Sequence, residues 1–300
     1  MGQLISENDV RRISDEFYFH QESKCGTLST IVKLVVRICE SHPMSEVALF
    51  IHSTATGPFM WAPMVGDCPE GVTPIAPTNR GYAMKDMLAR GTRISIQDEV
   101  AHIKSHIPKG TTGVHLIAHS YGGCVALALA TDGTVPVRSM CLYEPVLFAS
   151  LKAELDTLPA DVAAQVKQLY EDPDFLLNQD TGGDDNWIER FIDYWNQPGM
   201  WAAMPERAKT LTRMVGWKMF QEVRMVSEES LPFERYQTEV PLTLIQGEHT
   251  TLPAKAMVRR LAEQNPHAEV HTLDGQGHMA LVTAPQVVRP LLAKHWARVR

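Results

Sequence analysis

The sequence predicts an α/β fold with a mostly parallel, doubly wound sheet. Short apolar runs alternate with segments whose apolar residues recur at helical spacing, between residues 45 and 143 and again from residue 241 onward. Strands that alternate with helices in this way form parallel sheets with helices on both faces. Residues 150–234 contain only helical patterns, so we expect a helical segment inserted into one continuous sheet.

The composition is that of a globular protein and argues against a nucleic-acid partner. The 300 residues carry a formal net charge of −7 and contain no long run of lysine and arginine. The most apolar early run, residues 31–39, contains Lys33 and Arg37, which argues against a membrane-spanning helix. Five cysteines without a CxxC motif predict no disulfide framework and favour a reducing, cytoplasmic location.

The N-terminal region predicts a hairpin rather than a targeting sequence. The first thirty residues lack the apolar segment of a signal peptide. The start Met1-Gly2-Gln3-Leu4-Ile5-Ser6 fits the loose template for acylation of Gly2, although an ordinary start with a small second residue is the simpler interpretation. Residues 11–20 and 27–39 are rich in β-branched and aromatic residues, and we expect them to form an antiparallel pair of strands.

The next segments predict two strands and a helix. Residues 45–51 are apolar almost throughout, which is typical of a strand buried on both faces, and residues 72–77 predict a short strand. Residues 95–107 carry an apolar stripe at helical spacing. His102 and His106 are four residues apart on this helix, a spacing that can bind a metal, but no third ligand is evident and we expect no metal site.

A strand, a tight turn and a helix are predicted around Ser120. The apolar run 114–118 leads into His119-Ser120-Tyr121-Gly122-Gly123, and a run of small and apolar residues follows at 124–130. Small residues on both sides of the serine allow the strand and the helix to approach closely. The pattern small-x-Ser-x-Gly is typical of a nucleophile elbow, in which a strained turn exposes the serine hydroxyl.

The remaining segments complete the predicted sheet. Residues 139–143 form a buried strand that ends at Glu144, and helices are expected at 160–171, 184–196 and 205–229. Strands then follow at 241–247 and 269–273, with helices at 253–264 and 285–297. Functional groups gather at the carboxyl edge of such sheets, where Glu144 is predicted to lie, and His278 follows the last strand in a glycine-rich loop.

The residues around Ser120 resemble the nucleophile elbow of the α/β-hydrolase superfamily, with Ala118 where glycine is commoner. The resemblance extends from Val47 to the C-terminus. It implies a core formed by residues 1–149 and 235–300, and a helical cap at 150–234, inserted after the sixth strand. It also implies that Ser120 is the nucleophile and that His278, in the loop Gly275-Gln276-Gly277-His278, is the base.

The resemblance also implies an oxyanion hole. Family members carry His-Gly-x after the strand that corresponds to residues 45–51, whereas this chain has His52-Ser53-Thr54. The donors would be the backbone N–H groups of Tyr121 and Thr54, with Ser53 as the alternative to Thr54. A plain turn rich in serine, threonine and glycine is the other interpretation of this loop.

The position of the catalytic acid, the residue that would orient His278, departs from the commonest family pattern. Threonine stands at position 250 in Gly247-Glu248-His249-Thr250, where the family usually has aspartate. Glu144 is the favoured acid, because some members, haloalkane dehalogenases among them, place it after the sixth strand. Those enzymes use aspartate as nucleophile, so Ser120 argues against dehalogenation. Tyr143-Glu144-Pro145 also resembles a group of bacterial α/β hydrolases with a hydroxyl residue after strand seven. Glu248, Asp274 and the absence of any acid remain as alternatives.

The expected function is hydrolysis of an ester, lactone or thioester of a small apolar or aromatic substrate. Ser53 and the cap residues Trp187, Trp195 and Trp201 are candidates for the substrate pocket, although the tryptophans could equally pack the cap onto the core. A carbon–carbon bond hydrolase or a cofactor-free haloperoxidase would use the same triad. A non-catalytic binding protein is a further alternative, supported by Thr250 and opposed by the strained elbow.

We expect no cofactor, since no Gly-x-Gly-x-x-Gly follows an early strand. The expected partner is a small-molecule substrate, and a homodimer is left open.

Overall fold

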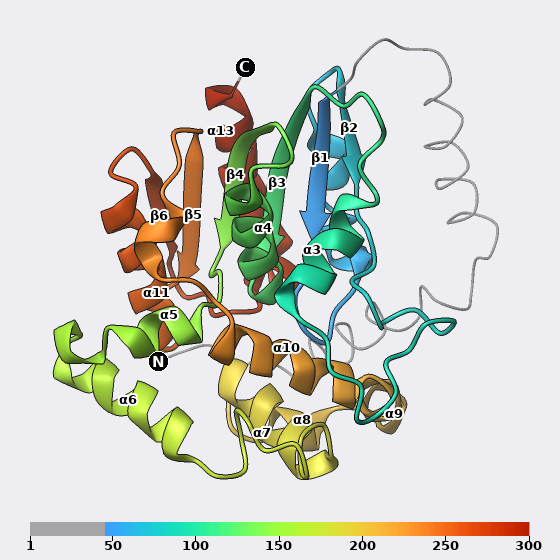
Figure 1. Cartoon of the computed structure of the whole chain (residues 1–300), viewed down its shortest axis with the longest axis vertical. Coiled ribbons are helices and arrows are strands. Elements are labelled where there is room, and N and C mark those ends of the chain that lie inside the picture. The colour runs from blue at the N-terminus through green and yellow to red at the C-terminus, as the bar shows by residue number, and fades with distance from the viewer. Residues whose placement is uncertain (1–45, 300) are drawn as a thin grey trace.

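Six strands form one parallel sheet in the computed structural model, which describes residues 46–299 (Figure 1). Their order across the sheet is β2-β1-β3-β4-β5-β6, and every neighbouring pair is parallel. The prediction of an α/β fold with a mostly parallel sheet is therefore confirmed. The predicted hairpin at 11–39 and the candidate acylation site at Gly2 lie outside the described residues. The strands are β1 Glu46–Ile51, β2 Val72–Ile75, β3 Gly113–His119, β4 Val137–Tyr143, β5 Leu242–Gly247 and β6 Glu269–Leu273.

Both faces of the sheet are covered, which explains why the central strands are continuously apolar. Val47, Leu49 and Ile51 pack into one core with helices α3 Ile96–Lys104, α4 Tyr121–Asp132 and α11 Leu252–Gln264. The alternate residues Ala48 and Phe50 pack into a second core with α12 Ala280–Thr283 and α13 Pro285–Arg298. Residues pointing to opposite faces alternate along each strand, so β1 contributes to both cores.

Side-chain caps fix the beginnings of two of these helices. Ser95 Oγ accepts a hydrogen bond from the N–H of Asp98 at 3.2 Å, and the Asp98 carboxylate accepts from the N–H of Ser95 at 2.9 Å. This capping box begins α3 at Ile96. Thr251 caps α11 in the simpler way, since its Oγ1 accepts from the N–H of Ala254 at 3.3 Å.

A group of helices separates β4 from β5 in the chain. Figure 1 shows α6 to α10 beyond the carboxyl ends of the strands, whereas α3, α4 and α11 lie against the sheet. The helices of this segment are α5 Phe148–Ala153, α6 Ala160–Glu171, α7 Asp185–Trp195, α8 Met200–Ala203, α9 Glu206–Met214 and α10 Gly216–Glu228. Short 3-10 helices occur at η1 Pro58–Trp61, η2 Val65–Asp67, η3 Leu155–Thr157 and η4 Phe233–Tyr236. We propose that residues 150–234 form a cap at the carboxyl edge of the sheet.

The prediction of one continuous helix over 205–229 is wrong, because the structure has two helices there, α9 and α10. The chain turns at Val215, between α9 and α10, because Gly216 packs directly on the backbone of Gly183. A Cβ atom at position 216 would lie 2.3 Å from the Gly183 carbonyl oxygen. The helical periodicity of the sequence continues across this point and gives no sign of the break. The short helices α5 and α8 were not predicted, since four to six residues carry little periodicity.

Within residues 46–299, none of the helices combines the length and apolar character needed to cross a bilayer.

The beginning of α4 lies against the end of β1, and Gly122 makes this approach possible. A Cβ atom at Gly122 would lie 2.4 Å from the Ile51 carbonyl oxygen and 2.7 Å from that of His52. At Gly123, a Cβ atom would lie 2.6 Å from Pro145 Cβ. Two adjacent glycines therefore let the helix that follows Ser120 enter between the ends of β1 and β4.

We expect Gly122→Ala to lower the free energy of unfolding by about 3 kcal/mol, because the added methyl group overlaps backbone that cannot move alone. Gly66→Ala is the control, since a Cβ atom there would meet nothing within 4 Å. Urea denaturation of both variants measures the difference. Equal denaturation midpoints for the two variants would contradict this account.

Candidate active site

Ser120 has the strained backbone that its sequence context predicts. Its φ of 56° and ψ of −121° place a non-glycine residue in a rarely populated conformation. The Ser120 N–H donates to the Tyr143 carbonyl oxygen at 3.0 Å, and the Ser120 carbonyl oxygen accepts from the Gly123 N–H at 2.9 Å. These bonds fix the turn between β3 and α4 and leave the side chain at the carboxyl edge of the sheet.

Among the described residues, three that are not glycine have positive φ, and all three lie at this edge. Ala55 follows β1 with φ 59°, Ser120 follows β3, and Glu144 follows β4 with φ 41°. Strained residues of this kind concentrate at functional sites, where the surrounding structure holds them in place. Neither Ala55 nor Glu144 carries a sequence signal for this conformation.

The structure brings together Ser120, His278 and Glu144. His278 Nε2 lies 2.9 Å from Ser120 Oγ, and His278 Nδ1 lies 2.5 Å from Glu144 Oε2. The three residues are 6%, 4% and 0% exposed. Because the Glu144 carboxylate accepts from Nδ1–H, the Nε2 atom is free to accept the proton of the serine hydroxyl.

Thr250, which departs from the family pattern, bonds directly to Glu144. Its Oγ1 hydroxyl donates to Glu144 Oε2 at 2.6 Å, while the Gly247 N–H donates to Glu144 Oε1 at 2.7 Å. The two alternative acids lie elsewhere. Glu248 accepts from the Gly275 N–H at 2.7 Å on the half-exposed side of its loop, and Asp274 is exposed.

His278 is held from three sides. His119 Nε2 donates to the His278 carbonyl oxygen at 2.9 Å, and the Tyr143 hydroxyl donates to the Gly277 carbonyl oxygen at 2.7 Å. Burial and the neighbouring His278 hold the pKa of His119 well below its usual value, so the His119 ring is neutral. Trp195 stacks on the His278 ring with centroids 3.9 Å apart and an interplanar angle of 25°. This stacking had no signal in the sequence.

The loop after β1 carries Thr54 and is internally bonded. His52 Nε2 accepts from the Asn79 N–H at 2.9 Å, and His52 Nδ1 donates to the Ser53 carbonyl oxygen at 2.8 Å. Burial lowers the pKa of His52 to about 4, which agrees with a neutral ring that donates and accepts. Ser53 Oγ lies 3.0 Å from Thr56 Oγ1, so the Ser53 side chain is engaged within the loop.

A small cavity lies beside Ser120. It is mainly apolar and aromatic, with Glu222 as its one ionisable carboxyl group. Its lining residues are Thr54, Ser120, Tyr121, Val146, Phe148, Phe175, Leu176, Phe191, Tyr194, Trp195, Glu222, Val223 and Val226. Glu222 was not predicted to lie in the site, because a single glutamate in an amphipathic helix is normally expected on the solvent-exposed face.

Of the four predicted pocket residues, the structure places only Trp195 on this cavity. Trp187 stands behind the lining, since it stacks on Phe191 and its Nε1 donates to the Phe175 carbonyl oxygen at 2.6 Å. Trp201 packs against the cationic groups of Lys209 and Arg213. Ser53 is turned toward Thr56, so these three residues lie outside the lining of this cavity.

His102 on α3 and His106 in the turn after this helix both contact backbone groups. His102 Nε2 lies 2.9 Å from the Thr78 carbonyl oxygen, and His106 Nδ1 lies 2.9 Å from the His102 carbonyl oxygen. No cluster of three or more histidine, cysteine, aspartate or glutamate side chains is arranged to hold a metal ion in the described part of the chain.

We expect Thr250→Val to lower the free energy of unfolding by about 1.5–3 kcal/mol, because a buried carboxyl group loses a hydroxyl donor. Turnover should fall as well, since Glu144 would be less firmly held. The control is Thr210→Val, which changes an exposed hydroxyl bonded only to its own helix. An equal decrease in the free energy of unfolding in both variants would contradict a stabilising role for the bond between Thr250 and Glu144.

Comparison with known proteins points to one family. The family model described as "Alpha/beta hydrolase family" matches residues 48–291. A hydrolase from Pseudomonas aeruginosa is similar in structure with a TM-score of 0.60 and 16% identity, covering 84% of this chain and 89% of that chain. MenH from S. aureus gives a TM-score of 0.59 at 15% identity, covering 86% and 96%. The 2-hydroxy-6-oxo-6-phenylhexa-2,4-dienoate hydrolase from Rhodococcus gives 0.54 at 20% identity, covering 84% and 91%.

One curated protein is similar over a shorter stretch. The probable lysophospholipase BODYGUARD 5 from Arabidopsis thaliana is 27% identical over 135 residues, which cover 41% of this chain and 29% of that protein. The matched region is therefore less than a third of the length of this relative.

Proposed function

Since the chain belongs to the alpha/beta hydrolase family, we propose that it is a serine hydrolase that cleaves an ester, lactone or thioester of a small apolar or aromatic substrate. The observation that carries this proposal is the chain of contacts from Ser120 Oγ through His278 to Glu144. Serine is a weak nucleophile unless a neighbouring base removes its proton, and this arrangement supplies both the base and the group that orients it.

Each residue has one role in the proposed reaction. His278 Nε2 takes the Ser120 hydroxyl proton as Oγ attacks the acyl carbonyl carbon. The resulting imidazolium is stabilised by Glu144, and the proton passes to the leaving alcohol or thiol as the bond to it breaks. A water molecule, deprotonated by the same nitrogen, then attacks the acyl-enzyme and releases the carboxylic acid and Ser120.

The backbone N–H groups of Thr54 and Tyr121 are the proposed donors to the negative oxygen of the tetrahedral intermediate. Support comes from their position, since both residues line the cavity beside Ser120. Tyr121 is also the first residue of α4, where the N-terminus of a helix favours negative charge. Removal of one donor of this kind typically lowers turnover about 10²- to 10³-fold.

The lining of the cavity supports an apolar or aromatic acyl group. Phe148, Phe175, Phe191, Tyr194 and Trp195 give the cavity aromatic walls. Aromatic side chains offer large apolar surfaces against which such a group would be removed from water. A carbon–carbon bond hydrolase or a haloperoxidase would use the same three residues, so substrate assays should include a ketone beside the esters.

A role as a non-catalytic binding protein agrees less well with the site. Thr250 was the main argument for it, but this residue donates to the buried Glu144 carboxylate and so supports an intact acid. A binding protein would also have no need of the strained backbone at Ser120 and Glu144, which costs about 1–3 kcal/mol for each residue.

We expect Glu144→Gln to lower kcat for an activated aryl ester about 10³- to 10⁴-fold, because glutamine cannot stabilise the imidazolium and favours the wrong tautomer. The matched variant is Glu248→Gln, which changes the half-exposed acid of the neighbouring loop and should keep kcat within about twofold of the unmodified protein. Circular dichroism and thermal unfolding verify that both variants are folded.

The opposite pattern would overturn the assignment. Full activity in Glu144→Gln together with loss in Glu248→Gln would move the acid to residue 248. Absence of hydrolysis of every ester and ketone by the unmodified protein would contradict the proposed activity itself.

A further inference from the structure

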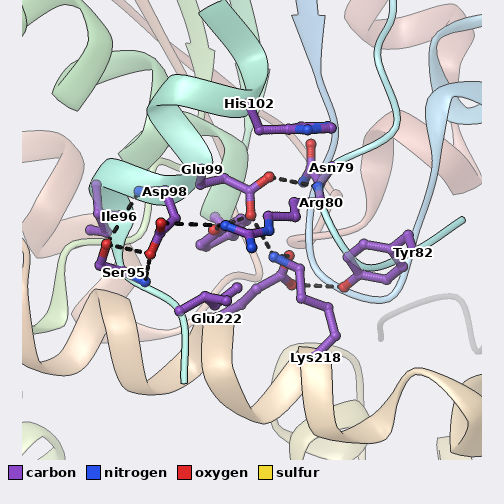
Figure 2. Close-up of polar contacts among 12 residues, drawn as sticks. Asn79, Arg80, Tyr82, Ser95, Ile96, Asp98, Glu99, His102, Lys218 and Glu222 are labelled. Atoms are coloured by element: carbon purple, nitrogen blue, oxygen red, sulfur yellow. Dashed lines mark hydrogen bonds and ion pairs between the residues drawn. The ribbon is translucent and has the colours of Figure 1, made fainter. Parts of the chain in front are cut away.

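A buried ion cluster lies next to the cavity, between helices α3 and α10 (Figure 2). Lys218 Nζ lies 2.5 Å from Glu99 Oε2 and 3.1 Å from Glu222 Oε1. All three side chains are at most 1% exposed. Burial of charged groups is costly unless they are paired and hydrogen-bonded, so a cluster of this kind calls for an explanation. We call these three residues the Lys218 cluster.

One carboxyl group of the Lys218 cluster holds the loop that carries Thr54. Glu222 Oε2 accepts from the Tyr82 hydroxyl at 2.7 Å, and the oxygen of that hydroxyl accepts from the Ala55 N–H at 2.9 Å. Thr54 and Glu222 also line the same cavity, and the Thr54 side chain lowers the pKa of Glu222 against the larger effect of burial. The strained residue Ala55, which follows Thr54 directly, is therefore bonded through Tyr82 to Glu222.

The other carboxyl group holds Tyr121. Glu99 Oε2 accepts from the Tyr121 hydroxyl at 3.1 Å, and Glu99 Oε1 accepts from the Arg80 N–H at 2.8 Å. Thr54 and Tyr121 are the two residues whose N–H groups form the proposed oxyanion hole. Tyr121 thus bonds through its hydroxyl to one of the two carboxyl groups that Lys218 joins, and the loop that carries Thr54 bonds to the other through Ala55 and Tyr82.

We propose that the Lys218 cluster is the positioning device of the oxyanion hole, an inference that rests on the function proposed above. Lys218 holds Glu99 and Glu222 at a fixed separation, and these hold Tyr121 and Thr54. Oxyanion donors act only when they are placed in advance within a few tenths of an ångström, so a fixed separation has a direct effect on turnover.

The charge of the Lys218 cluster agrees with this role. Burial, together with repulsion from Glu99, raises the pKa of Glu222 against the opposing effect of Lys218. Removal of the Lys218 ammonium group would therefore leave two buried carboxyl groups without the cation that both contact.

The cluster also makes the proposed site depend on the inserted helices. Lys218 and Glu222 lie on α10, whereas Glu99, Thr54 and Tyr121 belong to segments around the sheet. The geometry of the two N–H groups therefore requires that α10 be docked.

The test compares Lys218→Met with Arg224→Met. Arg224 is the matched control, because it is also a 1%-exposed cation on α10, paired with Glu228 and Glu229 at 2.7 and 2.9 Å. No bond joins Arg224 to Thr54, Tyr121 or Tyr82. Thermal unfolding, kcat and KM for an aryl ester would be measured for both variants and for the unmodified protein.

For Lys218→Met we expect kcat to fall about 10²-fold with KM changed less than about threefold, the pattern of a lost transition-state interaction. For Arg224→Met we expect lower thermal stability with kcat within about twofold. A folded Lys218→Met with unchanged kcat would overturn the inference, as would equal losses of kcat in the two variants.

If Lys218→Met does not fold, Tyr82→Phe decides the question, since it removes only the hydroxyl between Ala55 and Glu222. We expect kcat to fall about tenfold with KM unchanged, and unchanged kcat would overturn the inference. Failure of the proposed function would look different, because the unmodified protein would then have no activity.

Discussion

The burial of the Glu144 carboxyl group is the constraint on which the rest of the site depends. A carboxyl group with no exposure to water must find its hydrogen bonds within the protein. Its donors come from three segments: Gly247 at the end of β5, Thr250 before α11 and His278 in the loop after β6. One buried side chain at the end of β4 therefore fixes the loops that follow β5 and β6.

Backbone strain and sheet topology act together at this edge. The parallel sheet brings the carboxyl ends of β1, β3 and β4 side by side, and each is followed by a segment that contains a non-glycine residue with positive φ. Neighbouring strands hold two of these residues, since the N–H groups of Ser120 and Glu144 donate to the carbonyl oxygens of Tyr143 and Ile245. The third, Ala55, is held through Tyr82 by a helix of the insertion. Strain that local sequence would disfavour is thus maintained by the surrounding structure.

The sequence predicted the parts of the site that depend on local signals. Ser120 and Glu144 each follow a buried strand, His278 lies in the glycine-rich loop after the last strand, and the small residues around Ser120 allow a close turn, so the strands and these three positions could be predicted. The break between α9 and α10 could not, because it arises from contact of Gly216 with Gly183, which the periodicity of one helix does not encode. The Lys218 cluster could not be predicted from local patterns either, since Lys218 and Glu99 are 119 residues apart in the sequence.

The most direct test of the account is the intact mass of the protein after exposure to a fluorophosphonate, for the unmodified chain and for Ser120→Ala. An activated serine attacks the phosphorus and displaces fluoride, which leaves one covalent adduct. We predict a single adduct on the unmodified protein, mapped to Ser120 by peptide mass analysis, and none on Ser120→Ala. No adduct on the unmodified protein, or an equal adduct on both, would contradict the proposal that His278 and Glu144 activate Ser120.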